Sequence, residues 1–163
     1  MSDGRASFRL SDPRQFLALG FGSGLSPWAP GTAGSLAAIP LILVLARLPL
    51  VYYLLVVVLA VALGVWICGT TARAAGVHDH SAIVWDEITG MLIAMIGLPI
   101  SIATLVIAFL LFRLFDVVKP WPIGWLDRRI GGGWGIMLDD LLAGAAALIG
   151  GQALVWLGVP GLI

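Results

Sequence analysis

Long apolar runs fill most of the chain, and short polar stretches separate them. Two runs, residues 51–68 and 135–159, approach the roughly 20 residues that a helix needs to cross the hydrocarbon core of a bilayer. An earlier run follows "SPWAPGTAGS" and ends near Ala46, where "RLPL" turns the chain into the next run. The pattern predicts that these first two apolar segments form a helical hairpin.

A third apolar region, residues 88–115, is interrupted by "GLPIS". Proline removes a helical hydrogen bond and clashes with the preceding turn, so the region is either one kinked span or a second hairpin. In the hairpin, the first arm (residues 88–97) is only ~15 Å long, about half the hydrocarbon thickness. Such a short helix must have its ends buried in protein or facing a water-filled cavity.

The positions of the basic residues favour the hairpin. A turn at residues 97–101 places eight of the nine Lys and Arg residues on one side of the bundle and leaves Arg47 on the other, whereas a single span gives no clear bias. An excess of basic residues marks the cytoplasmic side. The eight residues are Arg5, Arg9, Arg14, Arg73, Arg113, Lys119, Arg128 and Arg129. We therefore expect a single membrane-embedded domain (residues 1–163), an all-α, polytopic bundle of about five helices with a short third helix.

Composition supports a membrane protein and excludes other classes. Hydrophobic residues make up 60% of the chain and the mean hydropathy is +1.05, well above the roughly 45–50% apolar content of globular domains. A net charge of zero and the lack of a basic segment interleaved with aromatic residues argue against nucleic acid. Glycine and proline break the apolar stretch after the N-terminal arginines, so we expect no cleaved signal peptide, and residues 12–22 to lie at the membrane surface. The single cysteine, Cys68, is expected to be an inert packing residue.

Five of the nine acidic residues lie in three stretches at the ends of apolar runs, "IVWDEITG", "FRLFDVVKPWP" and "GGGWGIMLDDLLAG". The hairpin would bring all three stretches to the cytoplasmic face. Carboxylates clustered at a low-dielectric boundary repel one another unless a cation neutralises them. Oxygen ligands without cysteine suit Mg²⁺ better than zinc. The predicted metal ligands are Asp86, Glu87, Asp116, Asp139 and Asp140.

A structural role is the alternative for two of these stretches. The paired acids that open the third and fifth helices could simply be first-turn residues, which favour a helix N-terminus. Asp116 does not fit that interpretation, because it ends a helix, where negative charge is unfavourable. His78 and His80 flank Asp79 in "VHDHS"; they are too few for a histidine metal site, and we expect a solvated loop there.

Anion binding is a separate expectation for "APGTAGS", where Thr32 and Ser35 open a helix whose free N–H groups favour a phosphate. The alternative is that Thr32 is an ordinary N-cap. Lys119 follows Asp116 by three residues, so on a continuing helix the two would share a face. Lys119 is then either a phosphate ligand or an ion-pair partner.

Three stretches, in their order along the chain, resemble the phosphatidylglycerophosphatase A family of bacterial membrane enzymes. They are "GFGSGLSPWAPGTAGSLAAIP", "GVHDHSAIVWDEITG" and "FRLFDVVKPWPIGWLDRRIGGGWGIMLDDLLAG". The resemblance implies a magnesium-dependent phosphatase of the bacterial inner membrane, and the count of basic residues places its active site at the cytoplasmic face. Its reaction converts phosphatidylglycerophosphate to phosphatidylglycerol and inorganic phosphate. The five acids would hold Mg²⁺ or act as general base. Candidates for holding the phosphate are Thr32, Ser35, Arg113 and Lys119.

Two other membrane functions fit the sequence less well. An ion-coupled transporter or channel should carry its ionisable residues through the depth of the bilayer. Here the acids cluster at segment ends, and the last helix beyond Asp140 has one polar side chain, Gln152. CDP-alcohol phosphotransferases also use aspartates and magnesium, but their D-x-x-D-G-x-x-A-R pattern is absent.

Overall fold

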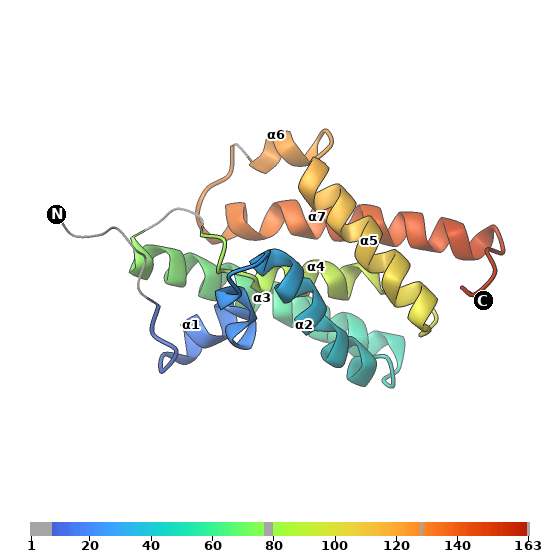
Figure 1. Ribbon diagram of the computed structural model, residues 1–163, viewed down its shortest axis with the longest axis horizontal. Helices are drawn as coiled ribbons and strands as arrows, with labels where there is room; N and C mark the ends of the chain where they lie inside the picture. Colours follow the sequence, from blue (N-terminus) through green and yellow to red (C-terminus); the bar gives the residue numbers. More distant parts are fainter. Residues whose placement is uncertain (1–7, 77–79, 128, 163) are drawn as a thin grey trace.

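The chain folds into a bundle of helices in the computed structural model, which describes residues 8–76, 80–127 and 129–162 (Figure 1). This part of the chain contains no strand. The helices are α1 (Pro13–Ala18), the 3-10 helix η1 (Gly20–Leu25), α2 (Pro30–Leu45), α3 (Leu50–Ala75), α4 (Trp85–Ala94), α5 (Ile102–Val118), α6 (Ile123–Asp127) and α7 (Gly132–Trp156).

The all-helical class predicted from the sequence is confirmed, and the five predicted apolar helices are α2, α3, α4, α5 and α7. The described residues add three short helices, α1, η1 and α6. These have six, six and five residues, too short to produce an apolar run in the sequence. α1 and η1 occupy the segment expected at the membrane surface, and Asp12 caps α1 by accepting the Arg14 N–H.

Two helices separated by a turn, not one kinked span, form the region around "GLPIS". Gly97 has a φ of 67° in this turn, and Ser101 caps α5 by accepting the Thr104 N–H at 3.0 Å. At ~1.5 Å per residue, the ten residues of α4 span about 15 Å, too little to cross a bilayer.

Neighbouring helices bury α4. Eight of its ten residues are buried, and the helix packs against α2, α3 and α7. The Tyr53 hydroxyl of α3 donates to the Leu92 carbonyl at 2.8 Å, and Gln152 of α7 donates to the Ile96 carbonyl at 3.1 Å. Side chains of the two long helices thus satisfy carbonyls near the C-terminal end of α4, as a short helix at membrane depth requires.

α3 and α7 are long and apolar enough to cross a membrane. Their outer faces expose large apolar side chains, among them Val51, Val58 and Ile149. A protein in water would not leave so many apolar residues on its surface. The exterior is therefore that of a membrane bundle.

α4 and α7 approach each other closely at a pair of glycines. A Cβ added to Gly144 would lie 2.5 Å from the Gly90 carbonyl oxygen, and one added to Gly90 would lie 3.0 Å from the Asp140 carbonyl oxygen. The two helices run in the same direction (Figure 1). Residues four apart share a helix face, so Asp86 lies one turn before Gly90 and Asp140 one turn before Gly144. The glycine contact thus brings these two acids together.

We expect Gly144→Val to lower the unfolding temperature of the detergent-solubilised protein by about 5 °C, because overpacking of a tight contact costs ~1–3 kcal/mol. Gly150→Val in the same helix is the matched control, since its Cβ would meet only the flexible end of Leu111, at 3.2 Å. Equal thermal shifts for the two variants would show that the glycine contact does not hold α4 against α7.

Candidate functional site

The five predicted acids converge in two overlapping groups, which together form the acid site. The inner group joins Asp86 and Glu87 of α4 to Asp140 of α7. The outer group consists of Asp116 of α5 with Asp139 and Asp140 of α7. In each group one ligand atom per residue lies within 4.8 Å of the others. Asp140 belongs to both groups and therefore lies at the centre of the site.

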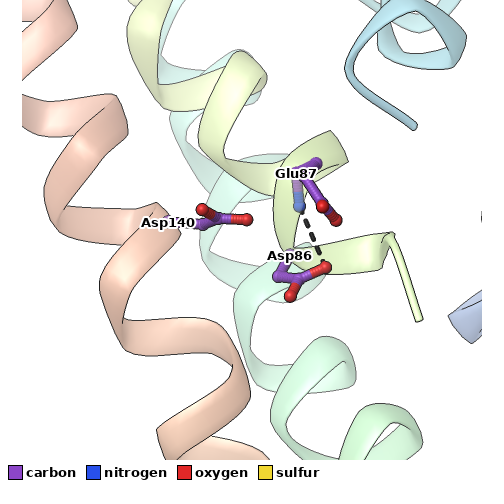
Figure 2. Close-up of side chains that lie close together, drawn as sticks. All are labelled: Asp86, Glu87 and Asp140. Carbon is purple, nitrogen blue, oxygen red and sulfur yellow. Dashed lines mark hydrogen bonds between the residues drawn. The ribbon is translucent and has the colours of Figure 1, made fainter. Parts of the chain in front are cut away.

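The inner group lies where α4 meets α7 (Figure 2), and it is largely buried, with Glu87 half-buried. Asp86 and Asp140 are 8% and 3% exposed. Asp86 Oδ1 accepts the Glu87 N–H at 3.1 Å, but Glu87 Oε2 and Asp140 Oδ1 are buried without a hydrogen-bond partner. Across the described ranges, no basic side chain forms an ion pair with these three acids. Buried carboxylate oxygens need donors or a cation, so this group has the chemistry of a hard-cation site.

The outer group has basic partners. Arg113 precedes Asp116 by about one turn on α5, and its Nη1 lies 2.6 Å from Asp116 Oδ2. Lys119 Nζ forms an ion pair with Asp139 Oδ2 on α7. The site therefore combines an inner, uncompensated negative region with an outer region in which acids and bases alternate. Basic side chains placed in this way can bind a phosphate next to a cation.

The sequence spacing predicts that Lys119 and Asp116 share a helical face if the helix continues. The structure differs, and the two residues do not share a face. α5 ends at Val118, and Lys119 adopts left-handed backbone angles (φ 44°) that turn the chain away from the helix. Of the two roles expected for Lys119, the structure shows an ion pair, but its partner is Asp139 on another helix. The role in phosphate binding stays a prediction.

Asp139 and Asp140 do not open the last helix, contrary to our expectation. α7 begins at Gly132, so this pair lies about two turns into the helix and the first-turn explanation is wrong for it. Glycine is unfavourable inside helices, but Gly133 is needed here for close packing: a Cβ there would overlap the Val65 carbonyl oxygen of α3 and lie 3.2 Å from the Gly69 nitrogen. The first-turn reading remains open only for the acids of α4, which are in its first turn.

The start of α2 differs in detail from the prediction. Ala29 is the N-cap and Pro30 the first helical residue, so Thr32 is not an ordinary N-cap. Ser35 is buried, and its hydroxyl donates to the Gly31 carbonyl at 2.8 Å. The Ser35 hydroxyl proton is therefore used within α2. The first N–H groups of α2, in contrast, have no acceptor within the helix and can bind an anion.

Gly31 places the start of α2 against the acid site. A Cβ on Gly31 would contact Glu87 Oε1 and lie 3.2 Å from Arg113 Nη1. An anion held by Arg113 would therefore also face the N-terminus of α2, whose dipole favours negative charge. The contact of Gly31 with the acid site was not predicted from the sequence. The only local indication of it is the proline–glycine pair that opens α2.

The remaining predicted residues are not members of the two acid groups or lie outside the described ranges. Cys68 is buried in α3, as expected of a packing residue. His78 and Asp79 lie outside the described residues. His80 accepts the Ala82 N–H through Nδ1 at 3.1 Å and contacts the Phe8 ring, which is a loop role.

Known proteins match most of the chain. The family model described as Phosphatidylglycerophosphatase A matches residues 16–155, a range that includes all five acids. The chain is 51% identical over 141 residues to a phosphatidylglycerophosphatase A of Escherichia coli strain K12, covering 86% of this chain and 82% of that protein. It is 44% identical over 142 residues to the protein of the same name from Haemophilus influenzae, covering 86% and 87%. No solved structure matches the chain.

We expect Asp140→Asn to raise the unfolding temperature in chelator by about 2–4 °C, because it removes one of several buried like charges. Added Mg²⁺ should stabilise the wild type and have a smaller effect on the variant, since a ligand of the folded state raises stability in proportion to its affinity. Thermal unfolding in detergent, with and without Mg²⁺, measures both effects. Asp12→Asn, a change in the cap of α1, is the control and should respond to Mg²⁺ as the wild type does. Identical Mg²⁺ responses of wild type and Asp140→Asn would remove Asp140 from the metal site.

Proposed function

The chain belongs to the phosphatidylglycerophosphatase A family, and we propose that it hydrolyses phosphatidylglycerophosphate to phosphatidylglycerol and inorganic phosphate with Mg²⁺. The observation that carries this proposal is the buried inner group of carboxylates beside Arg113 and the start of α2. Cation ligands next to anion-binding groups are what hydrolysis of a phosphomonoester requires.

The position of the acid site suits a lipid phosphate. The acids lie where α4 begins and α5 ends, at one end of the apolar bundle. A phospholipid has its phosphate at the membrane surface, so its ester bond can reach such a site while its acyl chains stay in the bilayer. We place the acid site at the cytoplasmic face of the bacterial inner membrane, supported by the excess of basic residues predicted at this end.

Mg²⁺ fits the donors of the inner group, because all of them are carboxylate oxygens and two are buried without a hydrogen bond. Asp86, Glu87 and Asp140 would hold it. When bound there, the cation would supply positive charge for the phosphoryl oxygens and Lewis-acid activation of the attacking water.

The chain's own residues then carry out the hydrolysis. Arg113 and the first turn of α2, including Thr32, bind the phosphoryl oxygens, and Lys119 adds positive charge from the end of α5. Asp116 and Asp139 orient these two basic side chains through their ion pairs. Water attacks phosphorus in line with the ester oxygen, and one carboxylate of the site accepts its proton and returns it to the leaving alcohol. Ser35 contributes by shaping the start of α2.

A transporter is less well supported than an enzyme. The acids gather in one site, whereas an ion pathway needs polar groups through the bilayer depth. Gln152, the polar side chain of α7 beyond Asp140, donates to the Ile96 carbonyl and so has a structural role.

Purified protein should release phosphate from phosphatidylglycerophosphate in Mg²⁺ and lose this activity in chelator. Asp86→Asn and Asp140→Asn should each lower turnover about 100-fold, because each removes a metal ligand or base. Asp12→Asn is the matched control, since Asp12 caps α1 and pairs with Arg14 away from the acid site. Full turnover in chelator by metal-stripped protein would refute the cation requirement, and normal rates in both acid variants would refute the site.

Single cysteines can test the orientation, starting from Cys68→Ala. Ser81→Cys and Trp121→Cys replace exposed residues beside the acid-bearing helix ends, and Leu48→Cys replaces an exposed residue in the loop before α3. In intact cells, a membrane-impermeant thiol reagent should label position 48 but reach positions 81 and 121 only after the membrane is opened. The opposite pattern would place the acid site outside the cytoplasm.

A further inference from the structure

An apolar groove runs between α2 and α5, the two helices that border the acid site with one end each. Its volume is about 200 Å³. All the side chains that line it are apolar: Leu36 and Ile39 from α2, and Ile102, Leu105, Val106 and Phe109 from α5. Leu36 and Val106 are 48% and 50% exposed, so the groove opens sideways to the surroundings of the bundle.

The groove leads away from the phosphate-binding residues. α2 begins at the acid site and α5 ends there, so the two helices are antiparallel (Figure 1). Leu36 lies one turn beyond Thr32, and Phe109 lies one turn before Arg113. The helices approach each other at Gly31 and Arg113, and farther along both pack on α4.

We propose that this groove holds one acyl chain of the phospholipid substrate while the phosphate lies at Arg113 and the start of α2. This inference rests on the proposed function. A lipid bound by its phosphate at the end of the bundle must direct its chains toward the bilayer midplane. The wall from Phe109 to Ile102 extends in that direction for about 10 Å, seven residues along α5.

The groove acts by orientation and not by hydrophobic affinity. An acyl chain that leaves the bilayer for an apolar groove exchanges one apolar environment for another, so burial provides little driving force. A chain held beside α5 fixes where the headgroup sits relative to Arg113, and misplacement by ~1 Å can cost up to 100-fold in rate. Chain length should therefore matter to turnover through this groove.

A second apolar depression provides a control. It lies on another side of α2, is lined by Phe21, Ala37, Leu41 and Val44 among others, and has a volume of about 700 Å³. No residue of α5 lines it, so it has no direct connection to the helix that carries Arg113 and Asp116.

The first test compares long-chain and six-carbon phosphatidylglycerophosphates as substrates of Val106→Trp and Leu36→Trp, which fill the groove from opposite walls. We expect kcat/KM to fall about ten-fold for the long-chain lipid and to stay within about two-fold for the short one. Ala37→Trp in the second depression and Leu110→Trp, at a position 58% exposed on α5, are matched controls and should behave as wild type. The inference is wrong if the controls lose as much long-chain activity as the groove variants, or if the groove variants lose none. It also fails if the short-chain rate falls as much as the long-chain rate.

A second test reads binding directly. Phosphatidylglycerophosphate with a photoreactive diazirine in one acyl chain is cross-linked to wild-type protein in chelator, and the labelled peptides are identified by mass spectrometry. Labels should concentrate on the groove residues of α2 and α5, and excess unlabelled substrate but not phosphatidylcholine should remove them. Uniform labelling that includes Val58 on the outer face of α3 would show bulk lipid contact and overturn the inference. If wild type releases no phosphate in the first test, the proposed function fails, while the labelling pattern still decides what the groove binds.

Discussion

The contact between Gly90 of α4 and Gly144 of α7 is the constraint on which the site depends. α4 is too short to cross a bilayer, so its neighbours must set its position. Small residues let two helix backbones meet without intervening side chains. Because Asp86 and Asp140 each precede one of these glycines by one turn, the contact that seats α4 also assembles the inner acids.

Charge is divided within the acid site in a way that separates two tasks. The inner carboxylates form no ion pair with a basic side chain in the described structure, and two of their oxygens are buried without a hydrogen bond. The outer ones hold Arg113 and Lys119 by ion pairs and thereby keep positive charge beside the inner acids. The N-terminus of α2 adds a third positive element through its dipole. A phosphoryl group between these elements would meet favourable charge on several sides.

The hairpin of α4 and α5 connects the chemistry to the membrane. By turning back at Gly97, the chain returns α5 to the level of the acids and leaves an apolar groove between α5 and α2. The exposed apolar faces of α3 and α7 suit a body surrounded by lipid. The same fold thus presents a polar site at one end of a body that stays apolar on its outside, which is what an enzyme acting on a lipid headgroup needs.

Local sequence determined the apolar helices, the interruption at "GLPIS" and the candidate acids, because hydropathy, proline and charge act within a few residues of their own position. The tertiary structure decided what those residues meet. Lys119 pairs with Asp139 and not with Asp116, since α5 ends one residue earlier than a shared face requires. Asp139 and Asp140 lie inside α7 because Gly133 before them packs on α3, a contact between distant segments that no local pattern records. The division into inner and outer acids likewise follows from the packing of α4, α5 and α7. The distances between these helices cannot be obtained from the order of residues along any one of them.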